Sequence, residues 1–157
     1  MEFFSRSLRE TNKAAGHFLA RLSPRPGGAT VVGLRGELGS GKTTFVQAVG
    51  RLLHLKEKIT SPTFVIIKTY DLRFCAYRKL VHVDAYRLKD SGELKKLRWL
   101  EITGDQKNLV FVEWPEHVRN VLPAGTIFID FEFLDETSRK IILPRSLILA
   151  GHPRQQG

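Results

Sequence analysis

The sequence predicts an α/β domain of three layers, in which helices cover both faces of a mixed parallel and antiparallel sheet. Two observations support this prediction. Short, apolar, β-branched runs alternate along the chain with segments whose apolar residues recur at helical spacing. One such run, residues 30–34, leads directly into a glycine-rich segment and then into a helical pattern, so that a tight loop joins a buried strand to a helix.

The glycine-rich segment fits G-x-x-x-x-G-K-[ST], the pattern of a phosphate-binding P-loop. In a P-loop, successive backbone N–H groups point inward and surround the phosphates. Glycines permit the positive φ values and the close approach of the backbone that this arrangement needs. Lys42 is expected to reach the β- and γ-phosphates, and the Thr43 hydroxyl to bind Mg²⁺. We therefore predict a P-loop NTPase-like domain whose nucleotide-binding residues are Gly36, Gly39, Ser40, Gly41, Lys42, Thr43 and Thr44.

Length and composition predict a single domain over residues 1–143, with a partly flexible C-terminal tail at 144–157. The N-terminal residues lack the apolar stretch of a secretory signal, and no apolar run approaches the length of a membrane span. The single cysteine, Cys75, excludes an internal disulfide and is typical of a reducing compartment. We expect a cytoplasmic protein with no membrane partner.

The chain is basic, because 25 lysines and arginines against 16 acidic residues give a net charge of +9. Such a charge favours nucleic acid or an acidic protein as a partner. No aromatic stacking platform and no known RNA-binding module accompanies it, however, and a solvated basic surface explains the charge equally well. Composition therefore leaves a nucleic-acid contact open.

Local patterns predict the other elements. In chain order they are a strand at Phe3 and Phe4, helices over 7–22 and from the P-loop to 55, a loop over 60–64, strands over 64–70 and 78–84, a helix over 93–100, and strands over 109–112, 127–133 and 139–143. Ser7 and Glu10 form a capping box for the first helix. The strands 64–70 and 78–84 should form an antiparallel hairpin, since their connection is short. His82 alternates with valines and should lie on one face of its strand, without a metal-binding role.

The loop over 60–64 has two interpretations. Pro62 favours extended geometry for Ser61, so the segment is a defined loop and not a helix. Its hydroxyl groups lie one connection past the P-loop helix, where nucleotide hydrolases carry a switch loop. An ordinary turn explains the same residues.

Two acids compete for a role in binding Mg²⁺ at the end of a buried strand. Asp84 follows the run 80–83, and aspartate is the commoner residue for this task. Glu113 follows the run 109–112, which is the purer apolar run and hence the better candidate for the strand beside the P-loop. The residues alone leave the choice between the two acids open.

Taken together, the motifs resemble those of the TsaE (YjeE) family. They are the G-E-L-G-S-G-K-T-T loop, Ser61-Pro62-Thr63-Phe64, the string His82-x-Asp84-x-Tyr86-Arg87-Leu88, and Glu113-Trp114-Pro115-Glu116, in the order seen in that family. The resemblance covers nearly the whole chain. It implies a bacterial cytoplasmic ATPase of the tRNA threonylcarbamoyladenosine pathway, which docks on a TsaB–TsaD complex that modifies an adenosine beside the anticodon.

The resemblance also implies roles for individual residues. Thr43 and Glu113 would bind Mg²⁺, Lys42 would hold the phosphates of ATP, and Asp84 would be a catalytic or water-orienting acid. The switch-like loop and the wall of the site would consist of Ser61, Pro62, Thr63, Phe64, Tyr86, Arg87 and Trp114. The junction at residues 7–11 would approach the nucleotide base. Direct contact with tRNA is not implied.

One departure from the family pattern concerns Arg98, which stands where the family often has glycine after a leucine. The tail after residue 143 matches no motif of the family. Two other functions compete with an accessory ATPase: a small-molecule kinase, and a nucleotide-gated binding module in which hydrolysis is incidental. The chain has no arginine-rich lid segment and little length for an acceptor pocket, which argues against the kinase.

Overall fold

A computed structural model describes residues 1–145, so most of the predicted tail, residues 146–157, lies outside the described part of the chain. The elements are β1 (Glu2–Ser5), α1 (Leu8–Leu19), β2 (Thr30–Arg35), α2 (Lys42–Leu52), β3 (Ile67–Asp71), β4 (Lys79–Asp84), α3 (Ser91–Lys95), α4 (Trp99–Gly104), β5 (Asn108–Glu113), the 3-10 segment η1 (Pro115–Val121), β6 (Ile127–Phe133) and β7 (Arg139–Ile142). No helix among residues 1–145 is both long and apolar enough to cross a bilayer.

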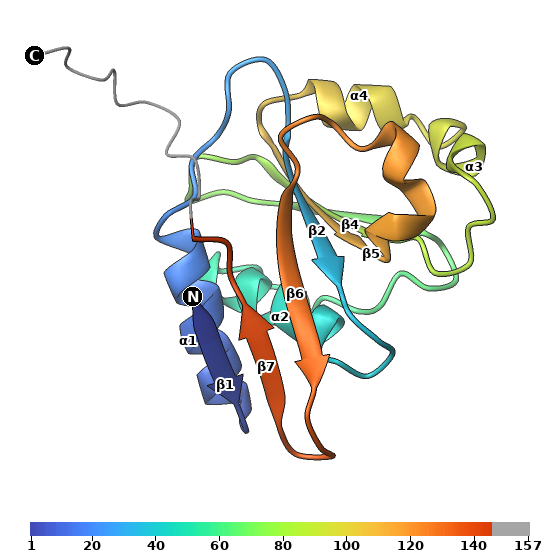
Figure 1. The fold of residues 1–157 in the computed structure, drawn as a ribbon. Helices are drawn as coiled ribbons and strands as arrows, with labels where there is room; N and C mark the ends of the chain where they lie inside the picture. The colour runs from blue at the N-terminus through green and yellow to red at the C-terminus, as the bar shows by residue number, and fades with distance from the viewer. Residues whose placement is uncertain (146–157) are drawn as a thin grey trace, which may run out of the picture.

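The strands form one sheet in the order β1-β7-β6-β2-β5-β4-β3, which confirms the predicted mixed sheet (Figure 1). The four central strands, β6, β2, β5 and β4, run parallel to one another. The outer strands are antiparallel: β3 pairs with β4, and β7 pairs with both β6 and β1. The predicted hairpin of β3 and β4 is therefore confirmed, and β5 does lie beside the P-loop strand β2.

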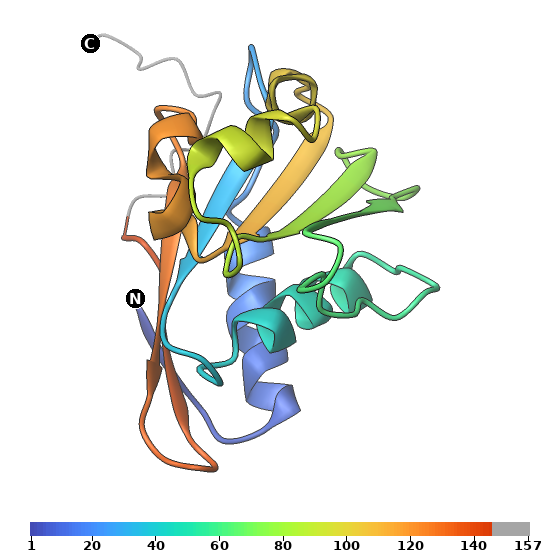
Figure 2. The ribbon, with the colours of Figure 1, turned by 90° about the vertical axis from the view of Figure 1, so that its right-hand side faces the viewer.

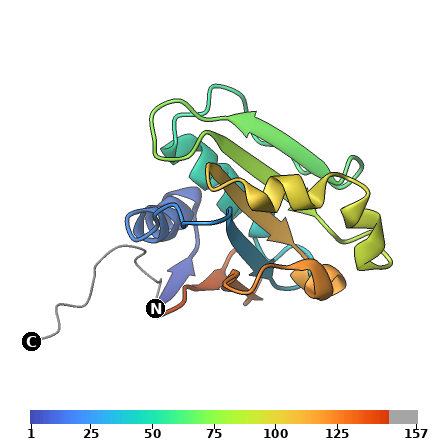
Figure 3. The same cartoon turned by 90° about the horizontal axis from the view of Figure 1, so that it is seen from above.

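Helices cover both faces of the sheet, as predicted (Figures 2 and 3). Alternation along the strands assigns each residue to a face. On one face, Val32 and Phe111 pack against α1 and α2 through Phe18 and Phe45. On the other face, Val31, Val81 and Val110 of the strands pack with Leu94 of α3, Trp99 of α4 and Val118 of η1. Each face thus has its own apolar core.

The first helix begins as its capping signal predicts. The Ser7 side chain accepts a hydrogen bond from the Glu10 N–H at 3.2 Å, and the Glu10 carboxylate accepts one from the Arg6 N–H at 2.5 Å. The second helix begins differently, because Gly41 precedes it with no side-chain cap. The exposed N–H groups at that helix end are left for another acceptor.

Three predicted boundaries differ from the structure by three residues, and the other differences, apart from the helix predicted over 93–100, are smaller. Helix α1 ends at Leu19 and α2 at Leu52, each three residues before the predicted end, and β3 begins at Ile67 because residues 64–66 form a turn.

The single helix predicted over 93–100 is wrong. The structure has two short helices, α3 and α4, and the chain turns between them at Arg98, whose φ of 61° lies in the left-handed region. Leu94 and Trp99 both reach the core, and this turn is what lets them do so. Leu97 and Leu100, which with Leu94 made the helical pattern, are 38% and 76% exposed. Arg98, which stands where the family often has glycine, thus adopts a conformation that glycine adopts more easily.

We expect Arg98→Gly to be more stable than Arg98→Ala by about 1 kcal/mol. A left-handed conformation costs a residue with a Cβ about 1–2 kcal/mol, and glycine avoids this cost. Part of the advantage is lost, because glycine also gives the unfolded chain more conformational freedom. Both variants remove the exposed ion pair of Arg98 with Glu101, so the comparison isolates the backbone. Thermal unfolding should give midpoints about 2–4 °C apart. Equal midpoints would show that this turn is unstrained.

Candidate nucleotide-binding site

A cavity of about 470 Å³ lies at the carboxyl ends of β2, β4 and β5. The parallel register brings these ends together: Leu34 is opposite Glu113, and Glu113 is opposite Asp84. Twelve of the residues predicted for the site line the cavity, namely Gly39, Ser40, Gly41, Lys42, Thr43, Thr44, Ser61, Thr63, Asp84, Tyr86, Glu113 and Trp114. The structure does not bring Gly36, Pro62, Phe64 or Arg87 to its wall.

The P-loop follows β2 and needs glycine at two positions in particular. Gly36 has a φ of 154°, and a Cβ there would lie 2.5 Å from the Phe131 carbonyl oxygen and 2.7 Å from the Ser40 Oγ. Gly41 has a φ of 99° and turns the chain into α2. The loop therefore packs against β6 on one side and presents the start of α2 to the cavity, an arrangement suited to binding an anion.

Lys42 is folded back across the P-loop. Its Nζ donates to the carbonyl oxygens of Gly36, at 2.5 Å, and Glu37, at 2.8 Å. The ammonium also lies 4.3 Å from the centre of the Trp114 ring. Burial lowers the pKa of Lys42, and the negative charges of Glu113 and Asp84 partly offset that effect. A charged lysine is thus held beside the cavity by groups that leave part of its hydrogen-bonding capacity for phosphate oxygens.

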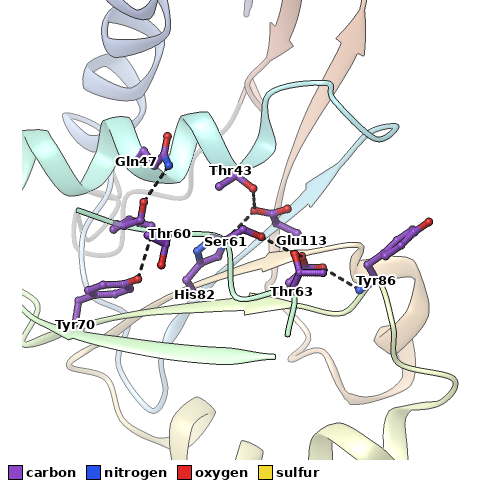
Figure 4. A network of polar contacts seen from close by, with 11 residues as sticks. Thr43, Gln47, Thr60, Ser61, Thr63, Tyr70, His82, Tyr86 and Glu113 are labelled. Carbon is purple, nitrogen blue, oxygen red and sulfur yellow. Dashed lines mark hydrogen bonds and ion pairs between the residues drawn. The ribbon is translucent and has the colours of Figure 1, made fainter. Parts of the chain in front are cut away.

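Glu113 ends β5 and is bound to the P-loop helix. The Thr43 hydroxyl donates to the Glu113 Oε1 at 2.6 Å, and the His82 Nε2 lies 2.8 Å from the same oxygen (Figure 4). Glu113 is buried, and a hydroxyl and an imidazole meet at that oxygen. This pairing of a P-loop hydroxyl with a strand-end carboxylate is the arrangement that P-loop proteins use for Mg²⁺.

Asp84 ends β4 and is bound to the loop over residues 60–66. Its Oδ2 accepts from the Thr63 hydroxyl at 2.9 Å, and its Oδ1 accepts from the backbone N–H of Tyr86 at 3.0 Å. The Thr63 hydroxyl in turn lies 2.6 Å from that of Ser61. The loop that was predicted to be switch-like therefore touches one of the two predicted acids directly.

The same loop is fixed at both ends. Gln47 of α2 donates to the Ile59 carbonyl oxygen at 2.9 Å, next to the start of the loop. At its end, the Ile66 carbonyl oxygen accepts from the Asp84 N–H at 2.9 Å. Ile66 has a φ of 69°, which a β-branched residue rarely adopts. The loop is thus held against β4 in a conformation that carries backbone strain.

Aromatic side chains form one wall of the cavity. The Tyr86 and Trp114 rings lie 5.1 Å apart, and His117 packs against both. Phe64 and Arg87 stack on each other outside this wall, with the guanidinium 4.5 Å from the Phe64 ring centre. The Phe64 ring is 82% exposed, so this pair lies on the surface beside the mouth of the site.

Several residues around the cavity were not predicted from the sequence. Ser5, Glu136, Thr137 and Arg139 line it, alongside residues 6–8 and 11 from the start of the first helix, where the base was expected. Arg139 of β7 donates through its Nε to the Gly39 carbonyl oxygen at 2.8 Å. Only knowledge that β7 and the P-loop share one end of the sheet would have revealed this contact, because 100 residues separate the two groups.

The donor set suits Mg²⁺ bound together with a nucleotide better than a metal held by the protein alone. Among residues 1–145 no group of three or more His, Cys, Asp or Glu side chains is placed to hold a metal ion. Thr43 and Glu113 provide a hydroxyl and a carboxylate, and Mg²⁺ typically takes one or two such ligands plus phosphates and water. The buried Ser40 Oγ also has no hydrogen-bond partner within the described chain, which suits a loop that receives an anion.

Comparison with known proteins extends the similarity to most of the chain. Residues 5–141 match the family model described as "Threonylcarbamoyl adenosine biosynthesis protein TsaE". The chain belongs to the TsaE family. The Aquifex aeolicus (strain VF5) protein TsaE is 31% identical over 147 residues, covering 92% of this chain and 99% of the relative. The Treponema pallidum (strain Nichols) protein TsaE is 33% identical over 144 residues, covering 90% and 98%.

A solved structure has a similar fold. The "Crystal structure of Bacillus subtilus YdiB" matches 90% of this chain and 82% of its own, with 27% identity and a TM-score of 0.62. Because the TsaE family model spans β2 through β7, it includes the P-loop and both strand-end acids within one matched region.

We expect Lys42→Ala to bind ATP about tenfold more weakly or worse, because hydrogen bonds to charged groups contribute about 1.5–3 kcal/mol. Titration calorimetry measures the change. Lys79→Ala is the matched control, since it removes an equal charge from the opposite end of β4. Equal ATP affinity in Lys42→Ala and the parent would contradict a phosphate-binding role for the P-loop.

Proposed function

We propose that the protein is a Mg²⁺-dependent, cytoplasmic ATPase that serves tRNA threonylcarbamoyladenosine biosynthesis together with a TsaB–TsaD complex. Membership in the TsaE family supports the role in that biosynthesis. One observation supports the ATPase activity most directly: Lys42, Thr43, Glu113 and Asp84 all line a single cavity at the P-loop.

Each of these residues has a role in hydrolysis that follows from its position in the site. Lys42 and the N–H groups at the start of α2 bind phosphate oxygens and offset their charge. Thr43 and Glu113 would hold Mg²⁺, which supplies charge neutralisation at the phosphates when bound. Asp84 sits on the next strand and would orient the attacking water and accept its proton. Tyr86 and Trp114 limit the access of bulk water to that side of the cavity.

The contacts of Asp84 support a protein that hydrolyses slowly by itself. Both carboxylate oxygens already accept hydrogen bonds, one of them from the Thr63 hydroxyl of the loop. Arg87 is stacked on Phe64 outside the cavity, so it supplies no positive charge at the phosphates in this conformation. A partner that rearranges residues 60–66 would act on Asp84 and Arg87 together. We therefore propose that the TsaB–TsaD complex accelerates turnover.

A nucleotide-gated binding module remains the second candidate, and one observation favours it. The Thr63–Asp84 bond couples the loop conformation to the site, so nucleotide binding alone would change the exposed surface at Phe64. Such a module needs no turnover for its function. The small-molecule kinase has no comparable support.

We expect Asp84→Asn and Glu113→Gln, which are isosteric changes, to affect different steps. Asp84→Asn should spare ATP affinity and lower the rate of hydrolysis about 100-fold or more, since a group that acts on the attacking water affects mainly the barrier. Glu113→Gln should instead raise the Mg²⁺ concentration needed for nucleotide binding. Calorimetry and single-turnover hydrolysis separate the two effects. The reverse pattern would exchange the roles, and no effect from either change would remove both acids from the site.

We also expect single-turnover hydrolysis to accelerate at least tenfold when purified TsaB–TsaD complex is added, a barrier reduction of about 1.4 kcal/mol. Release of inorganic phosphate without phosphorylation of a small molecule would exclude the kinase. Unchanged hydrolysis with a complex that nonetheless binds the nucleotide-loaded protein would favour the binding module. An isolated chain already as fast as the mixture would contradict the proposed activation.

A further inference from the structure

A buried histidine contacts Glu113 from the neighbouring strand. His82 lies in the middle of β4 with no exposed surface, and its Nε2 is 2.8 Å from the Glu113 Oε1. His82 and Asp84 share one face of β4, and Glu113 lies on the same face of β5, the one that α2 covers. Figure 4 shows the imidazole beneath the P-loop helix, beside the carboxylate.

The hydrogen-bonding partners of the imidazole indicate what this contact does. A carboxylate only accepts hydrogen bonds, so the His82 Nε2 carries the hydrogen and donates it. The other ring nitrogen, Nδ1, is buried and has no hydrogen-bond partner among the described residues. A hydrogen on Nδ1 would therefore lack an acceptor there, whereas a hydrogen on Nε2 has one in Glu113. Among residues 1–145, the one hydrogen-bond partner of this buried ring is Glu113.

Both donors reach the same oxygen of Glu113. The Thr43 hydroxyl and the His82 N–H converge on Oε1, whereas Oε2 receives no hydrogen bond from residues 1–145. Glu113 lines the cavity, so two contacts fix one oxygen and leave the other available to a ligand. A histidine that merely filled the core would need no such alignment, and an apolar residue of similar size would avoid burying an unpaired Nδ1.

We propose that His82 is a positioning residue of the metal site: its Nε2–H, together with the Thr43 hydroxyl, holds the Oε1 of Glu113 and leaves Oε2 to bind Mg²⁺ or a water of its shell. This inference rests on the proposed metal-binding role of Glu113. It adds a supporting contact of the kind that orients carboxylate ligands and raises their affinity for metal.

The test compares His82→Leu with His82→Gln. Leucine removes the donor, whereas the glutamine amide places an N–H donor where the histidine Nε2 lies. Nucleotide binding is measured by calorimetry across a Mg²⁺ titration and again in a chelator. His82→Leu should raise the Mg²⁺ concentration at half-maximal binding about tenfold, the low end of the usual effect of such supporting contacts, without changing affinity in the chelator. His82→Gln should recover most of that loss.

Each alternative outcome is decisive. An unchanged Mg²⁺ midpoint in His82→Leu, or equal shifts in both variants, would show that His82 only fills the core. Should His82→Leu fail to fold, as judged by thermal unfolding, His82→Asn replaces it, because the shorter amide cannot reach Glu113. His82→Asn should then show the same tenfold shift, and an unchanged midpoint would overturn the inference.

The Glu113→Gln variant separates this inference from the proposed function. If Glu113→Gln leaves the Mg²⁺ midpoint unchanged, the metal-binding role of Glu113 itself fails. If Glu113→Gln shifts the midpoint and His82→Leu does not, only the positioning role of His82 fails. In the double variant, His82→Leu should add no further shift, since a residue that acts through Glu113 has no effect once that carboxylate is gone. Additive shifts would contradict action through Glu113.

Discussion

The parallel pairing of β2, β5 and β4 is the constraint on which every part of the site depends. Leu34, Glu113 and Asp84 are aligned across these strands, so the P-loop and both acids emerge at one edge of the sheet. A slip of one residue would turn Glu113 and Asp84 to the opposite face, where α3, α4 and η1 pack. Burial opposes such a slip, because both faces of the three strands are buried and each face has its own matching core.

The site nevertheless places charge where the core would favour apolar groups. Lys42, Asp84 and Glu113 are each no more than 5% exposed. Burying such groups is costly unless they are paired and hydrogen-bonded. Here the carbonyl oxygens of Gly36 and Glu37 hold the ammonium, while Thr43, His82, Thr63 and the Tyr86 N–H hold the carboxylates. Each of the three charged groups thus has protein partners, and an incoming phosphate or cation would add further ones from the cavity, whereas the His82 Nδ1 has no partner among the described residues.

The sequence predicts the features that depend on neighbouring residues and misses those that depend on contacts between distant segments. The P-loop, the strand ends at Asp84 and Glu113 and the cap at Ser7 are short-range patterns, and the structure has all of them where expected. The break at Arg98 was missed because leucines at 94, 97 and 100 keep helical spacing across a turn that ends the helix. The contacts of Thr63 with Asp84, of His82 with Glu113 and of Arg139 with Gly39 depend on how distant segments meet, which periodicity does not report. That His82 and Asp84 share one face of their strand could nevertheless be predicted, because they are two residues apart.

Backbone strain separates the rigid part of the site from the adjustable part. Of the four non-glycine residues with positive φ among residues 1–145, Ile66 and Trp114 adjoin the cavity, one at the end of the loop and one directly after Glu113. Trp114 is held by Pro115 behind it and by packing on Tyr86 and His117. Ile66 is held chiefly by backbone hydrogen bonds to Asp84 and Pro62, while its neighbours Phe64 and Val65 are exposed. Strain persists only where the surroundings enforce it. The loop is therefore the part of the site whose conformation a docking partner could change at the lowest free-energy cost. The Thr63 hydroxyl would transmit that change to Asp84.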